Sequence, residues 1–396
     1  MHEPACGALT LLFKNPAKRI KNQKTSKKFK ESMIVGIIDA DTHIDETDAT
    51  WEYMAGGDSS YKPTTAYPSN PDPKLPPARY WVIDGKRQIR FIRSDKDSGT
   101  TVETRELLDV KKRLKHMDEL GTDTQVIYPT LFLMEATEKP EINAAMRRSY
   151  NRWLGDRCGQ SGGRLRWVCM PPLQNMDESL AEIRWSKDHG ACGILKKGDR
   201  EAGKYPADPY FEPLYAEAEK LDLPICIHTG SGVPDFSPAR EFSHGQFMRT
   251  KGAAINGVLG LILHKIPAKF PKLRFGCIEA GSMWAPFVAY DLRRQQLRQQ
   301  GRESTSVLGV PLIEVPVNVF EENRIYITCQ VDEDLPYIIK TVGENNLMVG
   351  SDYTHRDPSM ELEFRKELQA RADKGDIPQS AVQKILYDNP KTFYGL

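Results

Sequence analysis

Met33-Ile-Val-Gly-Ile-Ile-Asp-Ala-Asp-Thr-His43 is an apolar, β-branched run that ends abruptly in polar residues. Such a run predicts a buried strand over Ile34–Asp41. Asp41 and His43 are two residues apart, so on an extended strand their side chains project to the same side. A carboxylate and an imidazole placed in this way can bind one metal ion together. The stretch therefore predicts a buried strand and a candidate metal site at its carboxyl end.

Seven more short apolar runs follow along the chain. They are Asp123–Pro129, Leu165–Pro171, Ala191–Lys197, Pro224–His228, Leu273–Glu279, Arg324–Gln330 and Leu347–Asp352. Segments of helical period separate these runs. Eight buried strands that alternate with helices predict the α/β class and a single (β/α)₈, TIM-like barrel. An open doubly wound sheet is the alternative, but it usually carries a Gly-rich turn after its first strand, and no glycine follows Asp41 before Gly56.

The chain has 396 residues, more than the roughly 250 that such a barrel needs. Much of the surplus lies in a long, Pro- and Gly-rich insertion after the first strand, Asp45–Thr104, and in a loop after the fifth, Thr229–Gln246. Both leave carboxyl ends of strands, so we expect them to form the walls or lid of a substrate pocket. Residues 1–32 are strongly basic and poor in apolar residues, and we expect a flexible, disordered tail there. Residues 33–396 are then the barrel domain.

The bulk composition excludes several classes of protein. The formal net charge is +1, which creates no overall field for nucleic acid or an anionic membrane. No apolar run approaches the roughly 20 residues that span a bilayer. The seven cysteines are scattered without C-x-x-C spacing, which favours a reducing compartment over a disulfide framework or a thiolate zinc site. We therefore expect a cytoplasmic enzyme that takes a small-molecule substrate.

Polar side chains also stand at the ends of two later strands. His228 ends the fifth predicted strand and Asp352 ends the eighth. Each alone is equally well explained as a core histidine or a helix cap, but in a closed barrel both would converge on the same rim as Asp41 and His43. Two imidazoles and two carboxylates suit one divalent ion, zinc first, with manganese or iron(II) as alternatives.

Glu279 ends the sixth predicted strand and would lie beside that ion. It could accept a proton from water as a general base, or it could orient His228 instead. Burial among apolar neighbours would raise its pKa toward neutrality. Four further residues are candidate substrate contacts: Tyr128, Lys196, Trp284 and His355.

The fourth predicted strand ends in Lys196 and Lys197, one of which should point inward. A carbamylated lysine between two metal ions is conceivable, but the four ligands above already satisfy one ion. Contact with a substrate anion by either lysine is the more favoured functional reading, and a solvated charge at the rim is the simplest structural one.

Seven motifs together resemble a known family. They are Ile38-Asp-Ala-Asp-Thr-His43, Tyr150-Asn-Arg-Trp-Leu154, Arg164-Leu-Arg166, Pro224–His228, Phe270-Pro-Lys-Leu-Arg-Phe275, Glu279-Ala-Gly-Ser-Met-Trp284 and Gly350-Ser-Asp-Tyr-Thr-His355. The chain resembles the amidohydrolase superfamily, in the branch that includes aminocarboxymuconate-semialdehyde decarboxylase and related metal-dependent hydrolases. The resemblance implies a distorted barrel, usually dimeric, with one catalytic metal. It also implies that Asp41, His43, His228 and Asp352 are the metal ligands.

The chain departs from this family at two positions. Asp41 stands where many members have a histidine, a change that resembles known variants of the branch. Glu279 stands where the decarboxylases usually have a catalytic histidine, and a glutamate is better suited to deprotonating water. We therefore expect a hydrolase acting on an amide, lactone or ester, in which the metal activates water, Glu279 takes its proton and Asp352 assists the leaving group. A carboxy-lyase for an aromatic or unsaturated acid is the alternative, and an inert barrel used for binding is the third.

Overall fold

The computed structural model describes residues 36–69, 79–90, 93–230, 247–299 and 314–396. The predicted basic tail, residues 1–32, lies outside the described residues, as do the first two residues of the strand predicted at Ile34–Asp41. Most of the predicted loop Thr229–Gln246 lies outside them too.

Eight parallel strands form one sheet in which each strand pairs with the next along the barrel. The strands are β1 (Ile38–His43), β5 (Thr124–Tyr128), β6 (Leu165–Cys169), β7 (Ala191–Lys197), β8 (Ile225–His228), β9 (Phe275–Ile278), β10 (Ile325–Cys329) and β11 (Leu347–Val349). Each falls within or overlaps a predicted run, and the expected (β/α)₈ architecture is confirmed. Some strand ends differ from the prediction: β1 extends to His43 instead of ending at Asp41, and β11 ends at Val349, three residues before Asp352.

The barrel closes between β1 and the residues that follow β11. The amide of His43 donates to the carbonyl of Tyr353 over 2.9 Å, and the amide of Asp352 donates to the carbonyl of Asp41 over 3.0 Å. Gly350 allows this approach, because a Cβ at its position would lie only 2.2 Å from the Cβ of Asp41. The seam between first and last strand thus holds two of the predicted metal ligands, Asp41 and Asp352, close to each other.

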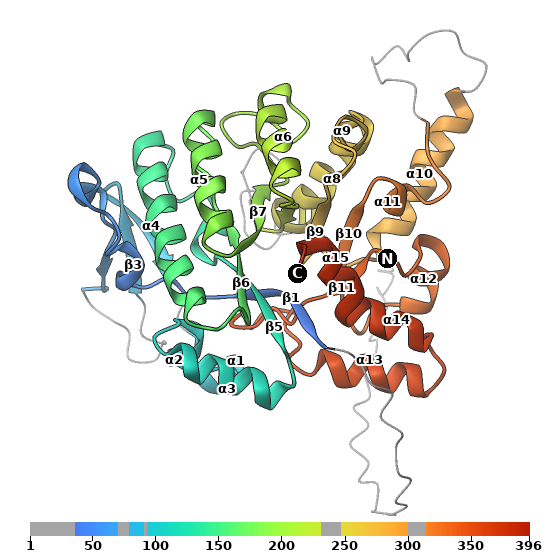
Figure 1. Ribbon diagram of the computed structural model, residues 1–396, viewed down its shortest axis with the longest axis horizontal. Coiled ribbons are helices and arrows are strands. Elements are labelled where there is room, and N and C mark those ends of the chain that lie inside the picture. Colours follow the sequence, from blue (N-terminus) through green and yellow to red (C-terminus); the bar gives the residue numbers. More distant parts are fainter. Residues whose placement is uncertain (1–35, 70–78, 91–92, 231–246, 300–313) are drawn as a thin grey trace, which may run out of the picture. The chain divides into compact units, whose positions relative to one another are not determined.

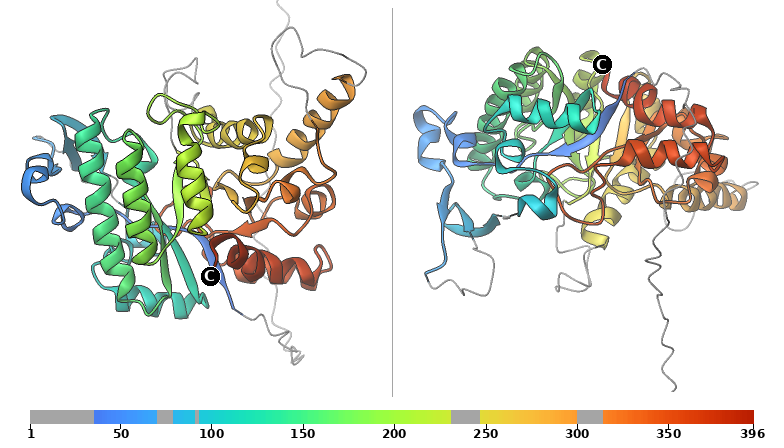
Figure 2. Two further views of the ribbon diagram at one scale, coloured as in Figure 1. Left: turned by 45° about the horizontal axis from the view of Figure 1, so that its top comes forward. Right: turned by 90° about the horizontal axis from the view of Figure 1, so that it is seen from below.

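Helices surround the sheet, and α4, α5 and α6 lie side by side outside it (Figure 1; Figure 2, left). The helices are α1 (Asp95–Ser98), α2 (Val102–Arg105), α3 (Val110–Leu120), α4 (Pro140–Gly159), α5 (Met176–Asp188), α6 (Glu212–Lys220), α8 (Ala253–Leu263), α9 (Ile266–Lys269), α10 (Trp284–Gln299), α11 (Val319–Glu322), α12 (Leu335–Val342), α13 (Phe364–Asp373), α14 (Gln379–Gln383) and α15 (Asn389–Tyr394).

Local sequence explains where such a helix begins and ends. The carboxylate of Asp109 accepts hydrogen bonds from the first amides of α3, and the helix ends at Gly121 in a left-handed conformation. Val110, Arg113 and Met117 form the buried face of this helix, at the spacing of one helical stripe. Apolar burial of this kind gives each helix its place on the barrel.

The insertion after β1 contains a small sheet that the sequence analysis did not anticipate. Its antiparallel strands are β2 (Thr64–Ala66), β3 (Arg79–Ile83) and β4 (Lys86–Arg90). Asp84 and Gly85, both at positive φ, form the two-residue turn between β3 and β4, and Asp-Gly is a favoured sequence for such a turn. The insertion therefore contributes a three-stranded sheet to the described residues 45–69, 79–90 and 93–104.

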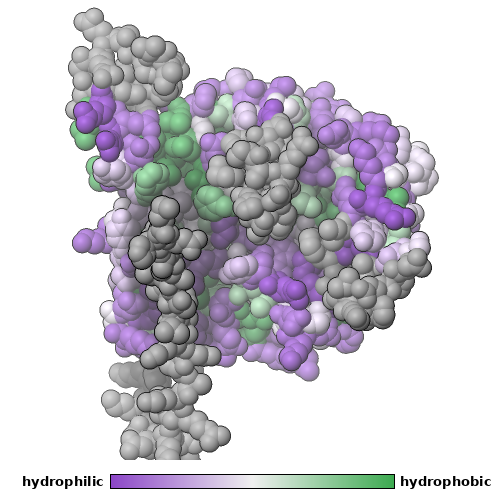
Figure 3. Space-filling view, turned by 180° about the vertical axis from the view of Figure 1, so that it is seen from behind, coloured by the Kyte–Doolittle hydropathy of each residue, from purple (hydrophilic) through white to green (hydrophobic). Residues whose placement is uncertain are grey.

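The surface of the described part is largely hydrophilic in the view of Figure 3, with green areas at its upper left. Exposed apolar side chains of α10 include Phe287, Tyr290 and Leu297. Among the described residues no helix has both the length and the apolar character needed to cross a membrane. Six described cysteines are free and buried.

Candidate active site

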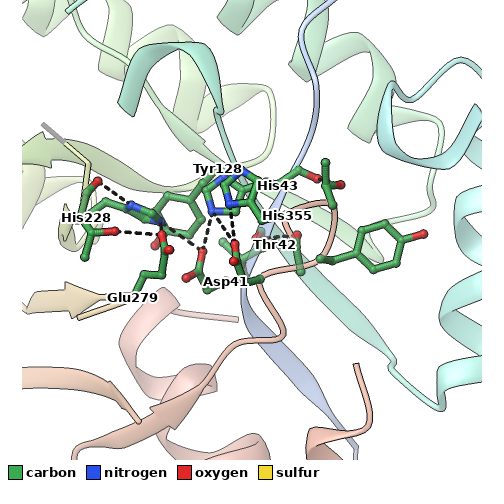
Figure 4. A network of polar contacts seen from close by, with 12 residues as sticks. Asp41, Thr42, His43, Tyr128, His228, Glu279 and His355 are labelled. Carbon is green, nitrogen blue, oxygen red and sulfur yellow. Dashed lines mark hydrogen bonds and ion pairs between the residues drawn. The ribbon is translucent and has the colours of Figure 1, made fainter. Parts of the chain in front are cut away.

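Six buried polar residues meet at the carboxyl ends of the strands, and Figure 4 labels all of them except Asp352. They are Asp41 and His43 from β1, His228 from β8, Glu279 directly after β9, and Asp352 and His355 after β11. Their ligand atoms form two overlapping sets, Asp41–His43–His228–Glu279 and His43–Glu279–Asp352–His355, and within each set these atoms lie within 4.8 Å of one another. The structure thus brings the four predicted ligands together with Glu279 and His355.

Hydrogen bonds to carbonyl groups fix the tautomer that two histidines adopt when they are neutral. Nδ1 of His43 lies 2.8 Å from the carbonyl oxygen of Pro129, and Nδ1 of His228 lies 3.0 Å from that of Thr229. A carbonyl only accepts, so each Nδ1 carries the hydrogen and each neutral ring keeps a lone pair on Nε2. Both Nε2 atoms lie 3.3 Å from the same oxygen, Oδ1 of Asp41.

His355 repeats this arrangement. The hydroxyl of Thr130 donates to the carbonyl of Ile44 over 2.6 Å, so it accepts from Nε2 of His355 over 3.0 Å. Nδ1 of His355 then turns its lone pair toward Oδ1 of Asp352, 2.7 Å away. When these rings are neutral, lone pairs of three imidazoles face carboxylates, an arrangement that a positive charge between them, a proton or a metal ion, stabilises.

Unsatisfied polar atoms support a metal at this place. Nε2 of His43 and both carboxylate oxygens of Asp352 are buried and make no hydrogen bond among the described residues. Such orphaned atoms cost free energy unless a ligand satisfies them. The nitrogen and oxygen atoms fit a borderline divalent ion such as zinc or manganese.

The pKa values of the cluster reflect its mutual repulsion. Burial raises the pKa of Glu279 to about 8, and the Asp41 and Asp357 carboxylates add to this. Burial and the neighbouring carboxylates, Glu279 first, hold the pKa of Asp352 well above its ordinary value. Burial lowers the pKa of His228, but the Asp41 and Glu279 carboxylates outweigh it and raise that pKa to about 9. The pocket therefore favours an added cation, whether a proton or a metal ion.

Two of the carboxylate residues also have a strained backbone. Glu279 has φ of 61° and Asp352 has φ of 51°, in the left-handed region that non-glycine residues rarely adopt. Thr354, between Asp352 and His355, has φ of 94°. Strain of this kind costs of order 1–3 kcal/mol per residue and clusters at functional sites. The surrounding fold holds these carboxylates in place against their own backbone preference.

The predicted substrate contacts fall in different surroundings. The ring of His355 stacks on that of His43 with centroids 3.9 Å apart, within the cluster. Tyr128 is buried beside His228, with ring centroids 4.9 Å apart, and its hydroxyl lies 2.6 Å from that of Tyr394 in the C-terminal helix. Its ring therefore packs against the cluster, while its hydroxyl contacts Tyr394 of α15.

Lys196 and Trp284 are placed away from the cluster by their contacts. The Lys196 ammonium lies 2.9 Å from Oε2 of Glu201 and 4.0 Å from the ring centroid of Phe211, which follows β7. Trp284 donates to the carbonyl of Gly281 and packs edge-on against Phe320 of α11. Both side chains have protein partners that account for their positions.

Residues that the sequence analysis did not single out support the cluster. The hydroxyl of Thr229 donates to Oε2 of Glu279 over 2.9 Å, and that of Thr328 accepts from the Glu279 amide. The carboxylate of Glu46 accepts from the amides of Thr130 and Leu131 and so holds the loop beneath His355. The only sequence signal for this role of Glu46 was its position three residues after His43.

Solved structures of several enzymes have the same fold. An amidohydrolase from Mycobacterium avium subsp. paratuberculosis K-10 superposes with a TM-score of 0.69 at 18% identity, over 91% of this chain and 99% of that one. A dihydroxybenzoic acid decarboxylase from Polaromonas sp. JS666, solved with manganese and the inhibitor 2-nitroresorcinol, gives a TM-score of 0.63 at 18% identity, over 91% and 97% of the two chains.

Relatives by sequence include gamma-resorcylate decarboxylases. That of Rhizobium radiobacter is 29% identical over 138 residues, which are 33% of this chain and 42% of the relative. The match thus spans less than half of the relative's length. The protein-family profile described as amidohydrolase, in contrast, matches residues 38–396. This chain therefore belongs to the amidohydrolase family and is an enzyme with that family's fold.

Proposed function

We propose that this chain is a metal-dependent carboxy-lyase that removes carbon dioxide from an aromatic or unsaturated carboxylic acid. The observation that carries the proposal is the buried cluster in which imidazole lone pairs and carboxylates face one another. The sequence alone favoured hydrolysis, but the gamma-resorcylate and dihydroxybenzoic acid decarboxylases among the relatives favour this alternative.

Asp41, His43, His228 and Asp352 are the residues that would hold one divalent ion, zinc or, as in the Polaromonas enzyme, manganese. When bound, this ion supplies a Lewis acid for the substrate carboxylate and a neighbouring oxygen. Glu279 and His355 adjoin these ligands and complete the pocket. His355 is oriented by Thr130, so its Nδ1 stays directed at Asp352.

Decarboxylation needs one proton at the carbon that loses its carboxylate. The carbon–carbon bond breaks, its electron pair stays on the substrate carbon, and a proton takes the place of carbon dioxide. Asp352 is the proposed donor, because it lies in the pocket and its Oδ1 is 2.7 Å from Nδ1 of His355, a second group that can transfer a proton. Glu279, whose pKa burial raises, is the second acid of the pocket.

Hydrolysis is the second candidate, and Glu279 is the observation that favours it. Its Oε2 lies 3.4 Å from Nε2 of His228 and is fixed by the Thr229 hydroxyl. A carboxylate so placed can take a proton from attacking water, and Asp352 can then assist the leaving group.

The two candidates differ in their products. The metal-loaded protein should be incubated with hydroxybenzoates and carboxyvanillate, and in parallel with amides, esters and lactones. Stoichiometric carbon dioxide release, with one deuterium in the product carbon when the solvent is deuterium oxide, is the expected result. Hydrolysis products without carbon dioxide would contradict the proposal, and absence of both turnover and stoichiometric metal would favour an inert barrel. The cytoplasmic location and the homodimer stay predictions.

A further inference from the structure

β7 ends in two lysines that project to opposite sides of the barrel wall. In the pairing of β7 with β8, Lys196 lies opposite Ile227 and Lys197 lies opposite His228. Side chains in register share a face of the sheet, so Lys197 is on the inner side with His228. Lys196 is on the outer side, where its ammonium packs on Phe211.

On the outer side, the carboxylate of Glu201 neutralises the charge of the Lys196 ammonium. Its Oε2 accepts from the Lys196 ammonium and from the Lys197 backbone amide, each over 2.9 Å. Arg147 lies 3.6 Å from its other oxygen. All three basic side chains lower the pKa of Glu201, which is about 2 although burial opposes the shift. Both carboxylate oxygens of Glu201 therefore have basic partners within the protein.

The inner ammonium, that of Lys197, depends on a different carboxylate. Its Nζ lies 2.9 Å from Oε2 of Glu135, while Oε1 of Glu135 accepts from the Asn143 side chain over 2.6 Å. Glu135 belongs to the segment between β5 and α4 that also carries Thr130, the partner of His355. The lysine side chain is 5% exposed, whereas that of Glu135 is 32% exposed.

The Lys196–Glu201 and Lys197–Glu135 ion pairs differ in how readily another anion can replace the glutamate. The Glu201 pair is sealed, with side chains that are 4% exposed or less. The Glu135 pair has one partner in contact with solvent, so an incoming anion can replace that carboxylate without leaving a buried charge uncompensated. A nearly buried ammonium on the His228 side of the wall is well suited to bind an anionic group, because it is already largely desolvated.

We propose that Lys197 binds a second anionic group of the substrate, and that Glu135 occupies Lys197 until the substrate displaces it. The inference rests on the proposed function, and it narrows the substrate class to acids with two anionic groups, such as an aromatic dicarboxylate. One group would lie at the metal ligands and the other at Lys197. Glu135 competes with this second group for the lysine and so lowers affinity for the dianion, whereas a monoanion at the metal ligands leaves the Lys197–Glu135 pair in place.

The test is calorimetric titration of the manganese-loaded full chain with benzene-1,3-dicarboxylate and with benzoate. The wild type is expected to bind the dicarboxylate about 10- to 100-fold more tightly. Lys197→Met should abolish this preference, and Glu135→Gln should increase it by freeing the lysine. A purely structural ion pair would instead give two less stable variants with unchanged preference, which would overturn the proposal.

Controls separate this result from general damage and from the reaction itself. Lys220→Met removes an exposed lysine that pairs with Glu217 and should leave the preference unchanged. Metal content and melting temperature identify a misfolded Lys197→Met protein, in which case Lys197→Gln and Glu135→Gln provide the test. No measurable binding of the dicarboxylate to wild type would also overturn the proposal. The binding measurement does not depend on turnover. A protein that prefers the dicarboxylate but releases no carbon dioxide would therefore refute the proposed decarboxylation and still support Lys197 as the binding site of the second anionic group.

Discussion

Glu201, after β7, and Glu279, after β9, are both buried glutamates at carboxyl ends of barrel strands, yet their environments are opposite. Basic side chains surround Glu201 and lower its pKa to about 2. Glu279 is buried with Asp41 and Asp357 nearby, and its pKa rises to about 8. Burial raises the pKa of both groups, so the neighbouring charges decide the difference.

Glu201 thus has a structural role, whereas Glu279 has the features of a residue that takes part in a reaction. Glu201 has partners for its charge and contributes stability. Glu279 has a strained backbone and like charges as neighbours, features that reduce stability and are typical of sites where charge changes during a reaction.

The largest expected effect is a loss of turnover on substitution of Asp352, which lies in the same cluster as Glu279. Asp352→Asn keeps the side-chain shape but removes the proposed proton donor and a metal-ligand charge. We expect turnover to fall by about 10³-fold, with a melting temperature close to that of wild type. Steady-state kinetics of carbon dioxide release and a thermal melt measure both. A loss below tenfold would remove Asp352 from the proposed chemistry.

Glu201→Gln should have the opposite profile. Loss of this carboxylate leaves Lys196 buried without its partner, so we expect the free energy of unfolding to fall by about 3–5 kcal/mol. Turnover per folded molecule should stay near that of wild type. Urea unfolding checks the first value, and Glu217→Gln, which removes a pair with the exposed Arg184, is the control, with an expected cost below about 1 kcal/mol.

Glu279→Gln tests whether burial alone predicts stability. Burial raises the pKa of Glu279 from 4.5 to about 8, so at pH 7 the folded metal-free protein holds a proton that the unfolded chain has lost. An amide avoids this cost and should raise the free energy of unfolding by up to about 3 kcal/mol. Turnover should fall by about 10²-fold with metal content retained. Undiminished turnover would refute a role for Glu279 in either reaction.

The smallest effect concerns acid stability. The pKa of Glu201 is about 2 in the fold and near 4.5 for an ordinary glutamate. Its stabilisation is therefore complete above about pH 4.5 and is lost as the pH falls toward 2. Unfolding titrations between pH 6 and pH 3 should show a steeper loss for wild type than for Glu201→Gln. Parallel curves would mean that Glu201 does not retain its charge in the fold.

The barrel could be predicted because its strands are buried on both faces and are therefore continuous apolar runs that need no knowledge of their partners. Asp41, His43, His228 and Asp352 were predicted to converge because closure of the barrel places carboxyl strand ends on one rim. The strands of the insertion were missed, although Asp84-Gly85 carried a hairpin signal.

Other features depend on contacts that sequence spacing does not define. Alternation predicts that Lys196 and Lys197 point to opposite sides, but a shift of one residue reverses which side each takes. Lys196 was the predicted substrate contact, but the register places it with Ile227 on the outer side. Glu135 and Glu201 reach these lysines from loops, whose paths follow from tertiary packing.

The closure of the barrel at Gly350 has a consequence for how the molecule opens. β11 has three residues, and the hydrogen bonds of Asp352 and His43 carry the join to β1. Short pairings of this kind open locally at lower free energy than the central ladders. Asp41 and Asp352 lie on either side of this join, so a bound ion would act as a clasp across it. Hydrogen exchange at these amides should accelerate on chelation, and a cell that withholds the metal would present proteases with a barrel already loosened at one edge.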